Sequence, residues 1–225
     1  MKQVFDHFSR EAKSFDQGII KSVPYYLEML QILCLMFPYP KNKNIKIMDV
    51  GVGTGNISYA VKTAFPNAQI VCLDLAPKML EVAKEKLKGF KGIEFVHANI
   101  EDYKFEQKFD AIVSSLTLHH LETDKEKHSF HKKAFDALKK GGIFINIDIV
   151  IAPDKHTQNI NIGKWKEHIL KSANENFVKD RYKKYLEEDR PAIILNELNS
   201  LKNVGFKYVD VFFKYFNFAV YGGRK

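Results

Sequence analysis

Residues 49 to 55 read Asp49-Val50-Gly51-Val52-Gly53-Thr54-Gly55 and follow the short apolar run 45–48. This pattern predicts a strand that ends in a glycine-rich turn, with a helix beginning at about Asn56. Because glycine has no Cβ, such a turn lets the backbone approach a ligand closely. The first turn of the helix adds free N–H groups and the positive end of its dipole at the same place.

The glycine spacing separates two kinds of nucleotide site. Dinucleotide-binding turns read G-x-G-x-x-G, whereas here Asn56 stands at the position of the third glycine. A second strand is predicted over 69–74 and ends on Asp74. An acid at the end of the second strand of an open α/β sheet can accept hydrogen bonds from both ribose hydroxyls. The pattern favours a nucleoside site without a pyrophosphate, and Asp74 could also cap the next helix.

The composition is that of one folded domain in a reducing compartment. The chain has 225 residues, 45% of them apolar and 13% aromatic, which suits a single core. Its only cysteines, Cys34 and Cys72, fall in apolar runs, so we expect reduced structural thiols. Residues 1–10 lack a signal-peptide pattern, and no apolar run has the length of a membrane span. We therefore expect a cytoplasmic protein that does not bind membranes.

The charge is strongly basic, with a formal net value of +8 and a pI of about 9.2. Lysines are dense in 125–140 and 179–184 but otherwise alternate with glutamates. Contact with nucleic acid and a lysine-rich host composition both account for such a balance, so the charge alone leaves the partner open.

The alternation of strand and helix patterns along the remaining chain predicts an α/β fold. Predicted strands alternate with helical segments, which indicates a parallel, doubly wound sheet; after the first two, these strands are 93–97, 111–115 and 143–150. A capping box at Thr123-Asp124-Lys125-Glu126 starts a helix over 124–140, which Gly141-Gly142 should end. Two β-rich runs close the chain, 208–215 and 216–222. They should pair antiparallel as a hairpin, giving a Rossmann-like seven-stranded sheet.

We expect one domain over residues 1–225 with two additions. Residues 1–40 have a helical pattern that breaks at Pro24, and we interpret them as a lid. Residues 152–190 are polar and helical in pattern, and we interpret them as an insertion on the substrate side. Trp165 in this insertion is either packed within it or available as a stacking platform.

These motifs together resemble the class I S-adenosylmethionine-dependent methyltransferases, over residues 45–225. The resemblance implies S-adenosyl-L-methionine as the cofactor. It implies that Met79 packs on adenine and that Asn99 and Ile100 read the adenine amino group, although the family usually has aspartate at position 99. The remaining implied contacts come from the glycine turn and the end of the second strand: Asp49, Gly51, Val52, Gly53, Gly55, Asp74 and Leu75.

The segments 15–26 and 205–218 also resemble carboxy-S-adenosylmethionine synthases, enzymes of the tRNA wobble-uridine pathway. By that resemblance Tyr26 covers the amino-acid end of the cofactor and Ser115 lies near it. The chain departs from this family at Ser200, where the family has an arginine for the extra carboxylate. Serine cannot form a bidentate pair with a carboxylate, so the departure implies plain S-adenosylmethionine.

Methyl transfer to an oxygen or nitrogen that carries a proton also needs a base in reach. His119 and His120 follow the fourth strand at the ligand-binding edge, and Asp148 lies near the end of the fifth. Each is either a candidate catalytic group or a structural one bonded to the backbone. His128 and His131 share a helix face but lack a third ligand at fitting spacing, so no metal is expected.

The sequence favours an S-adenosylmethionine-dependent methyltransferase acting on an oxygen or nitrogen of a small molecule. One alternative is a tRNA-modification enzyme, either a methyltransferase or a synthase of the carboxylated cofactor. Another is a nucleoside-binding protein without turnover. These motifs do not determine the methyl acceptor. They also leave the oligomeric state open, with a homodimer as one candidate.

Overall fold

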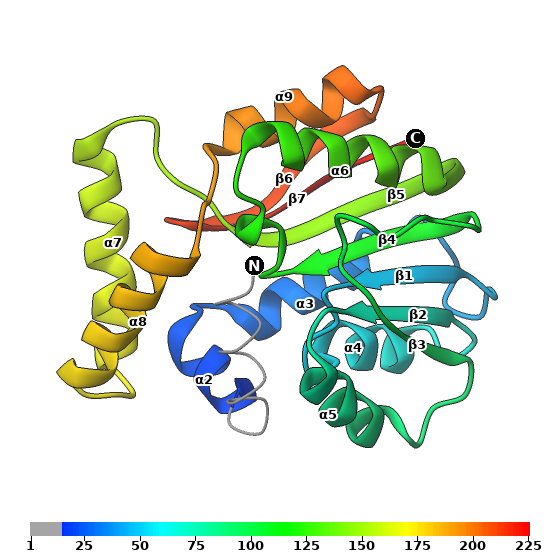
Figure 1. The fold of residues 1–225 in the computed structure, drawn as a ribbon, viewed down its shortest axis with the longest axis horizontal. Helices are drawn as coiled ribbons and strands as arrows, with labels where there is room; N and C mark the ends of the chain where they lie inside the picture. Colours follow the sequence, from blue (N-terminus) through cyan, green and yellow to red (C-terminus); the bar gives the residue numbers. More distant parts are fainter. Residues whose placement is uncertain (1–14) are drawn as a thin grey trace.

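A seven-stranded sheet with helices on both faces forms the centre of residues 15–225, the part of the chain that the computed structural model describes (Figure 1). The strand order is β3-β2-β1-β4-β5-β7-β6. The first five strands pair parallel, and β7 is antiparallel to both β5 and β6. The predicted doubly wound sheet with a terminal hairpin is therefore confirmed. The strands are β1 (Lys46–Val50), β2 (Gln69–Asp74), β3 (Ile93–His97), β4 (Phe109–Ser115), β5 (Leu138–Ile149), β6 (Lys207–Tyr215) and β7 (Phe218–Arg224).

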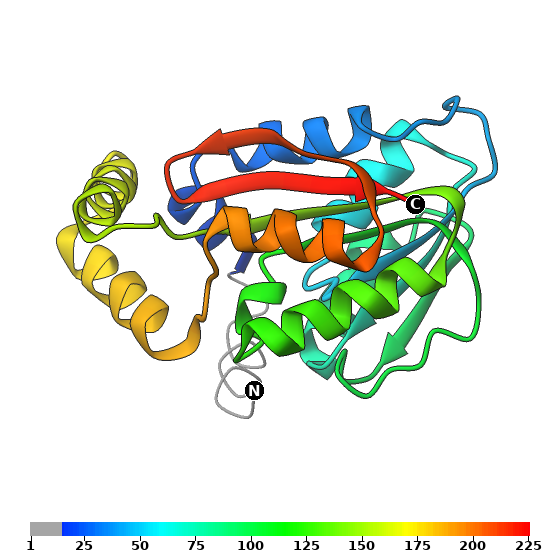
Figure 2. The same ribbon diagram turned by 90° about the horizontal axis from the view of Figure 1, so that it is seen from above.

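The central strands are apolar on both sides because helices cover both faces of the sheet. Alternate residues serve opposite cores: Ile145 packs with α3 and α4, whereas its neighbour Phe144 packs with α6 and α9. Figure 2 shows α3 and α6 on opposite sides of the strands. The helices are α2 (Phe15–Ser22), α3 (Tyr26–Leu35), α4 (Asn56–Ala64), α5 (Pro77–Leu87), α6 (Asp124–Ala137), α7 (Lys155–Leu170), α8 (Glu175–Glu188) and α9 (Ile194–Val204), with a 3-10 turn η1 (Leu118–His120).

The junction of α6 and β5 differs from the prediction. The helix begins at the expected capping box but ends at Ala137, and the strand begins at Leu138, before the two glycines. Leu138 is buried opposite Phe109, and the β4–β5 register then shifts so that Ala111 pairs with Ile143. The glycines therefore form an irregularity inside the strand, because burial of Leu138 outweighs the local helix signal.

The other boundaries move by a few residues. The fourth strand starts at Phe109 rather than at 111. The last strand starts at Phe218 rather than at 216, because Phe216 has a left-handed φ of 49° and belongs to the hairpin turn. The antiparallel hairpin itself is confirmed.

The additions to the sheet meet each other beside its carboxyl end. The insertion forms α7 and α8, as expected, and both project beyond the sheet (Figure 1). Trp165 is only 5% exposed, and its Nε1 donates a hydrogen bond to Ser22 O of α2 at 2.6 Å. Trp165 thus packs the insertion onto the N-terminal helices instead of offering a free stacking face. Residues 1–14, the first part of the predicted lid, lie outside the described residues.

Among the described helices, none is long and apolar enough to cross a membrane. Cys34 and Cys72 are free thiols in this part of the chain, as predicted.

Candidate functional site

The turn after β1 requires glycine at three positions. Gly51, Gly53 and Gly55 have φ angles of 68°, 54° and 89°, all in the left-handed region that favours glycine. A Cβ on Gly51 would lie 2.2 Å from Thr117 Oγ1. The turn is therefore wedged against the segment that follows β4, and the two segments together form one wall of a pocket.

Asp74 at the end of β2 holds this turn in place. Its Oδ2 accepts a hydrogen bond from Gly53 N at 2.7 Å, and its Oδ1 accepts one from Ala76 N at 2.8 Å. A carboxylate has about four lone-pair sites, so both oxygens can still accept from ribose hydroxyls. The two roles weighed for Asp74, structural and ligand-binding, are compatible in this geometry.

Asp49 supplies a buried carboxyl group in the lining of the pocket. Ser58 Oγ donates to its Oδ2 at 2.6 Å, and burial raises the pKa of Asp49 to about 7. Among residues 15–225 no donor reaches its Oδ1, which is also buried. An unsatisfied acceptor of this kind is costly, and the ammonium group of S-adenosylmethionine is a donor of fitting charge.

Most residues that the sequence singled out line this one pocket: Tyr26, Asp49, Gly51, Val52, Gly53, Asp74, Leu75, Met79, Ile100, Ser115 and His120. Further lining residues were not assigned to the cofactor from the sequence: Ile19, Thr54, Asn56, Ile57, Leu73, Ala76, Ala98, Leu116, Thr117 and Leu121. The lining combines the apolar Met79 and Ile100 with acidic and glycine residues, which suits a ligand with a flat base and a polar tail.

Two predicted cofactor residues lie outside this lining. A Cβ on Gly55 would face Leu87 of α5 at 3.1 Å, so Gly55 serves the packing of α4 on α5. Asn99 Oδ1 accepts from Glu101 N at 3.1 Å, so its side chain closes its own turn. Its neighbours Ala98 and Ile100 line the pocket but Asn99 does not, and the adenine contact of Asn99 stays a prediction.

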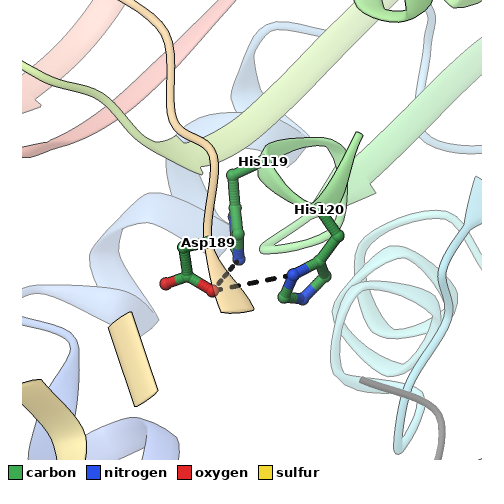
Figure 3. Close-up of side chains that lie close together, drawn as sticks. All are labelled: His119, His120 and Asp189. Carbon is green, nitrogen blue, oxygen red and sulfur yellow. Dashed lines mark ion pairs between the residues drawn. The ribbon is translucent and has the colours of Figure 1, made fainter. Parts of the chain in front are cut away.

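The predicted catalytic groups are brought together, but in an unexpected arrangement. His119 Nδ1 bonds Asp148 Oδ1, and His119 Nε2 lies 3.4 Å from Asp189 Oδ1. His120 Nδ1 lies 3.6 Å from the same Asp189 oxygen (Figure 3). Sequence reasoning missed Asp189, which stands at the end of the insertion without any motif around it.

The two histidines differ in charge because their neighbours differ. Burial alone would lower the pKa of His119, but the carboxylates of Asp148 and Asp189 outweigh it and raise that pKa to about 10. Burial, together with the adjacent His119, lowers the pKa of His120 to about 3. His119 is engaged by two acids and does not line the cofactor pocket, whereas His120 does.

A second cavity adjoins the pocket on the insertion side. It shares Ile19, Leu116 and His120 with the pocket. Its wall on α8 carries the cationic side chains Arg181 and Lys184, which sequence reasoning treated only as part of a charged segment. We call this cavity, with Trp165, Tyr185 and Phe218 also in its lining, the anterior chamber.

Ser200 lines neither cavity. It sits on α9, where its Oγ bonds His128 Nδ1 at 3.0 Å and His131 Nδ1 at 2.8 Å. It belongs to the α6–α9 interface and lines neither the pocket nor the anterior chamber. The inference drawn from Ser200 about the form of the cofactor therefore does not follow from this geometry.

A series of buried hydrogen bonds links Asp148 to Glu197 through Asn146 and Tyr221. Asn146 Nδ2 donates to Asp148 Oδ2 at 3.1 Å and lies 2.9 Å from Tyr221 OH, which donates to Glu197 Oε2 at 3.0 Å. Burial, followed by the charge of Asp148, raises the pKa of Glu197 to about 7.

We expect Glu197→Gln to flatten the pH dependence of stability. The raised pKa means that the carboxyl group of Glu197 holds its proton more tightly in the folded chain than in the unfolded chain. The free energy of unfolding should therefore fall as pH rises from about 4.5 to 7. Glutamine does not titrate, so the variant should avoid this fall in the free energy of unfolding, which amounts to up to about 3 kcal/mol above pH 7. Urea unfolding between about pH 5 and pH 8 measures it, with the exposed Glu81→Gln as the control. Equal slopes for Glu197→Gln and the unmutated protein would contradict the prediction.

The lid contact gives a second expectation. Tyr26 is buried, lines the pocket and lies 3.5 Å from Ser115 Oγ, whereas the next residue of α3, Leu27, is 53% exposed. Tyr26→Ala should weaken S-adenosylhomocysteine binding roughly tenfold by removing apolar contact area. Leu27→Ala should leave it unchanged in the same calorimetric titration. Equal affinities for the two variants would show that Tyr26 only packs α3.

Comparison with known proteins agrees with this geometry. Residues 47–142 match the family model described as a methyltransferase domain. The fold is shared with an O-methyltransferase family protein from Burkholderia thailandensis, at a TM-score of 0.72 and 16% identity, covering 100% of this chain and 62% of that one. The chain therefore contains a methyltransferase domain over residues 47–142, and it has the fold of S-adenosylmethionine-dependent methyltransferases.

Two curated relatives indicate different branches of that family. A carboxy-S-adenosyl-L-methionine synthase from Campylobacter lari is 27% identical, over 98% of this chain and 94% of its own length. A malonyl-[acyl-carrier protein] O-methyltransferase from Ilyobacter polytropus is 36% identical, but over only 52% of this chain and 41% of its own. The match to the synthase includes the lid and the insertion, whereas the second match is confined to about half of the chain.

Proposed function

We propose that the protein transfers the methyl group of S-adenosylmethionine to an oxygen or nitrogen of a small molecule that carries an anionic group. The observation that carries this proposal is the anterior chamber, which joins the cofactor pocket and has Arg181 and Lys184 in its wall. The sulfonium methyl is already activated, so the enzyme must mainly align the acceptor and exclude water. Alignment can supply roughly 7–11 kcal/mol of the barrier.

The residues of the chain would divide this work. Asp49, Asp74 and the glycine turn hold the cofactor, and the cationic wall holds the acceptor's anionic end. His120 lines both cavities, so among the predicted catalytic groups it is the one that can contact the acceptor beside the cofactor. His119 is held between Asp148 and Asp189 and is a positioning residue in this scheme.

A second candidate is synthesis of carboxy-S-adenosylmethionine, as the name of the Campylobacter lari relative says of that protein. The same chamber favours it, because its cationic wall beside the cofactor pocket suits a carboxylate on the sulfonium. A place in tRNA modification would then be indirect, through the product. Ser200 gives no argument against this candidate, since it lines neither cavity.

Competition binding separates the two candidates. Plain and carboxylated S-adenosylmethionine are compared on the unmutated protein, on Arg181→Gln and on Lys179→Gln, an exposed residue of the same helix. A preference for the carboxylated form that only Arg181→Gln abolishes supports the synthase. A preference for the plain form, with S-adenosylhomocysteine released when small hydroxy or amino acids are added, supports methyl transfer. The chamber has no anion-binding role if Arg181→Gln leaves unchanged both the KM for these acids and the preference between plain and carboxylated S-adenosylmethionine.

A further inference from the structure

Three side chains with metal-binding atoms meet in the wall of the anterior chamber. His119 and His120 come from the 3-10 turn after β4, and Asp189 comes from the end of α8. Their nearest ligand atoms lie within 4.8 Å of one another, and the two imidazoles face the same carboxylate oxygen (Figure 3). No other such group occurs among residues 15–225.

The separations fit a small metal ion. Zinc bonds to nitrogen and oxygen ligands are about 2.0–2.2 Å long, so neighbouring ligands of a tetrahedral ion lie about 3.4 Å apart. His119 Nε2 and His120 Nδ1 are 3.4 and 3.6 Å from Asp189 Oδ1. These distances exceed ordinary hydrogen bonds. The ligand atoms of the two histidines lie within 4.8 Å of each other, so rotation of the imidazoles toward Asp189 would close the set around an ion.

The surroundings of His119 are those of a metal ligand. Its Nδ1 faces Asp148, which is 2% exposed on β5. A histidine that donates one ring N–H to a carboxylate has its tautomer and ring orientation fixed, with the other nitrogen free to coordinate. The backbone secures the third ligand, because Arg190 N donates to His119 O at 2.7 Å beside Asp189. One contact therefore fixes His119 against β5, and the other joins the turn to the end of the insertion beside Asp189.

We propose that His119, His120 and Asp189 bind a divalent transition metal, with Asp148 orienting His119. Two imidazoles and one carboxylate suit Zn²⁺ better than Mg²⁺ or Ca²⁺, which prefer sets of oxygen ligands. All three residues line the anterior chamber, so the remaining coordination position is open to water or to a ligand in that chamber. Metal binding at this place goes beyond the proposed methyl transfer and does not require it.

The test is a zinc titration of the full chain, purified without an affinity tag and stripped with a chelator. Calorimetry against a competing chelator should find one zinc ion per chain, while Mg²⁺ gives no comparable signal. Asp189→Asn and His120→Gln should each weaken zinc binding at least a hundredfold. Asp148→Asn should weaken it about 10–100-fold, as expected for an orienting partner. His156→Gln, an exposed histidine on α7, should leave it unchanged.

Two results would overturn the proposal. One is the absence of a saturable site for one zinc ion; the cluster is then an ion-pair network of His119 between two acids. The other is an equal loss in His156→Gln, which would assign the zinc to surface histidines. If a variant fails to unfold cooperatively, the visible absorption of Co²⁺ bound to the unmutated protein reports a tetrahedral site without any substitution. S-adenosylhomocysteine titrations of the same samples test the cofactor pocket separately, so failure of either proposal is recognised independently.

Discussion

Replacing Asp74 by alanine should weaken binding of S-adenosylhomocysteine at least a hundredfold. Two losses combine in this variant. The ribose hydroxyls lose their charged acceptor, at about 1.5–3 kcal/mol for each hydrogen bond. Gly53 N and Ala76 N lose the carboxylate oxygens that they contact at 2.7 and 2.8 Å, so the glycine turn is no longer fixed against β2. Calorimetry with the demethylated cofactor measures the sum.

A conservative variant separates the two contributions. Asp74→Asn retains the shape and one acceptor, but its amide group would face either Gly53 N or Ala76 N, so it should lose an intermediate amount. Asp136→Ala removes an exposed acid of α6 and should have no effect. Unchanged affinity in Asp74→Ala would show that Asp74 does not bind the ribose and that its role is limited to its hydrogen bonds with the backbone.

Gly51→Ala should reduce stability by about 2–5 kcal/mol and impair cofactor binding. A non-glycine residue at φ 68° is strained by about 1–2 kcal/mol. Overpacking adds about 1–3 kcal/mol, because the new Cβ would lie 2.2–2.7 Å from Oγ1, Cγ2 and Cβ of Thr117. Rotation of Thr117 cannot relieve a clash that includes its own Cβ. Urea unfolding of the two proteins gives the difference.

Two further variants test the cause of that loss. Gly89→Ala places a Cβ in open space and should change stability little. Adding Thr117→Gly to Gly51→Ala removes the clash but keeps the strained φ, so stability should recover only in part. Full stability of the single Gly51→Ala variant would show that the turn can move away from Thr117, and that the wall they form is not rigid.

Local pattern determined the scaffold and the cofactor side of the site. The order of strands and helices, the hairpin and the capping box at Thr123 could be read because each depends on residues close together in sequence. The glycine turn and Asp74 could be placed because the carboxyl ends of neighbouring parallel strands share one edge. The same reasoning failed at 138–142, where burial of Leu138 opposite Phe109 overrides the helix signal.

The acceptor side was decided only by the tertiary structure. Asp189 meets His119 and His120 because the insertion leaves the sheet after β5 and returns beside the turn that follows β4, a contact across about 70 residues that no spacing encodes. The return places Arg181 and Lys184 of α8 in the chamber wall and leaves Ser200 on the α6–α9 interface. Periodicity fixes which face of a helix is apolar, but the partner of its polar face depends on packing between distant segments.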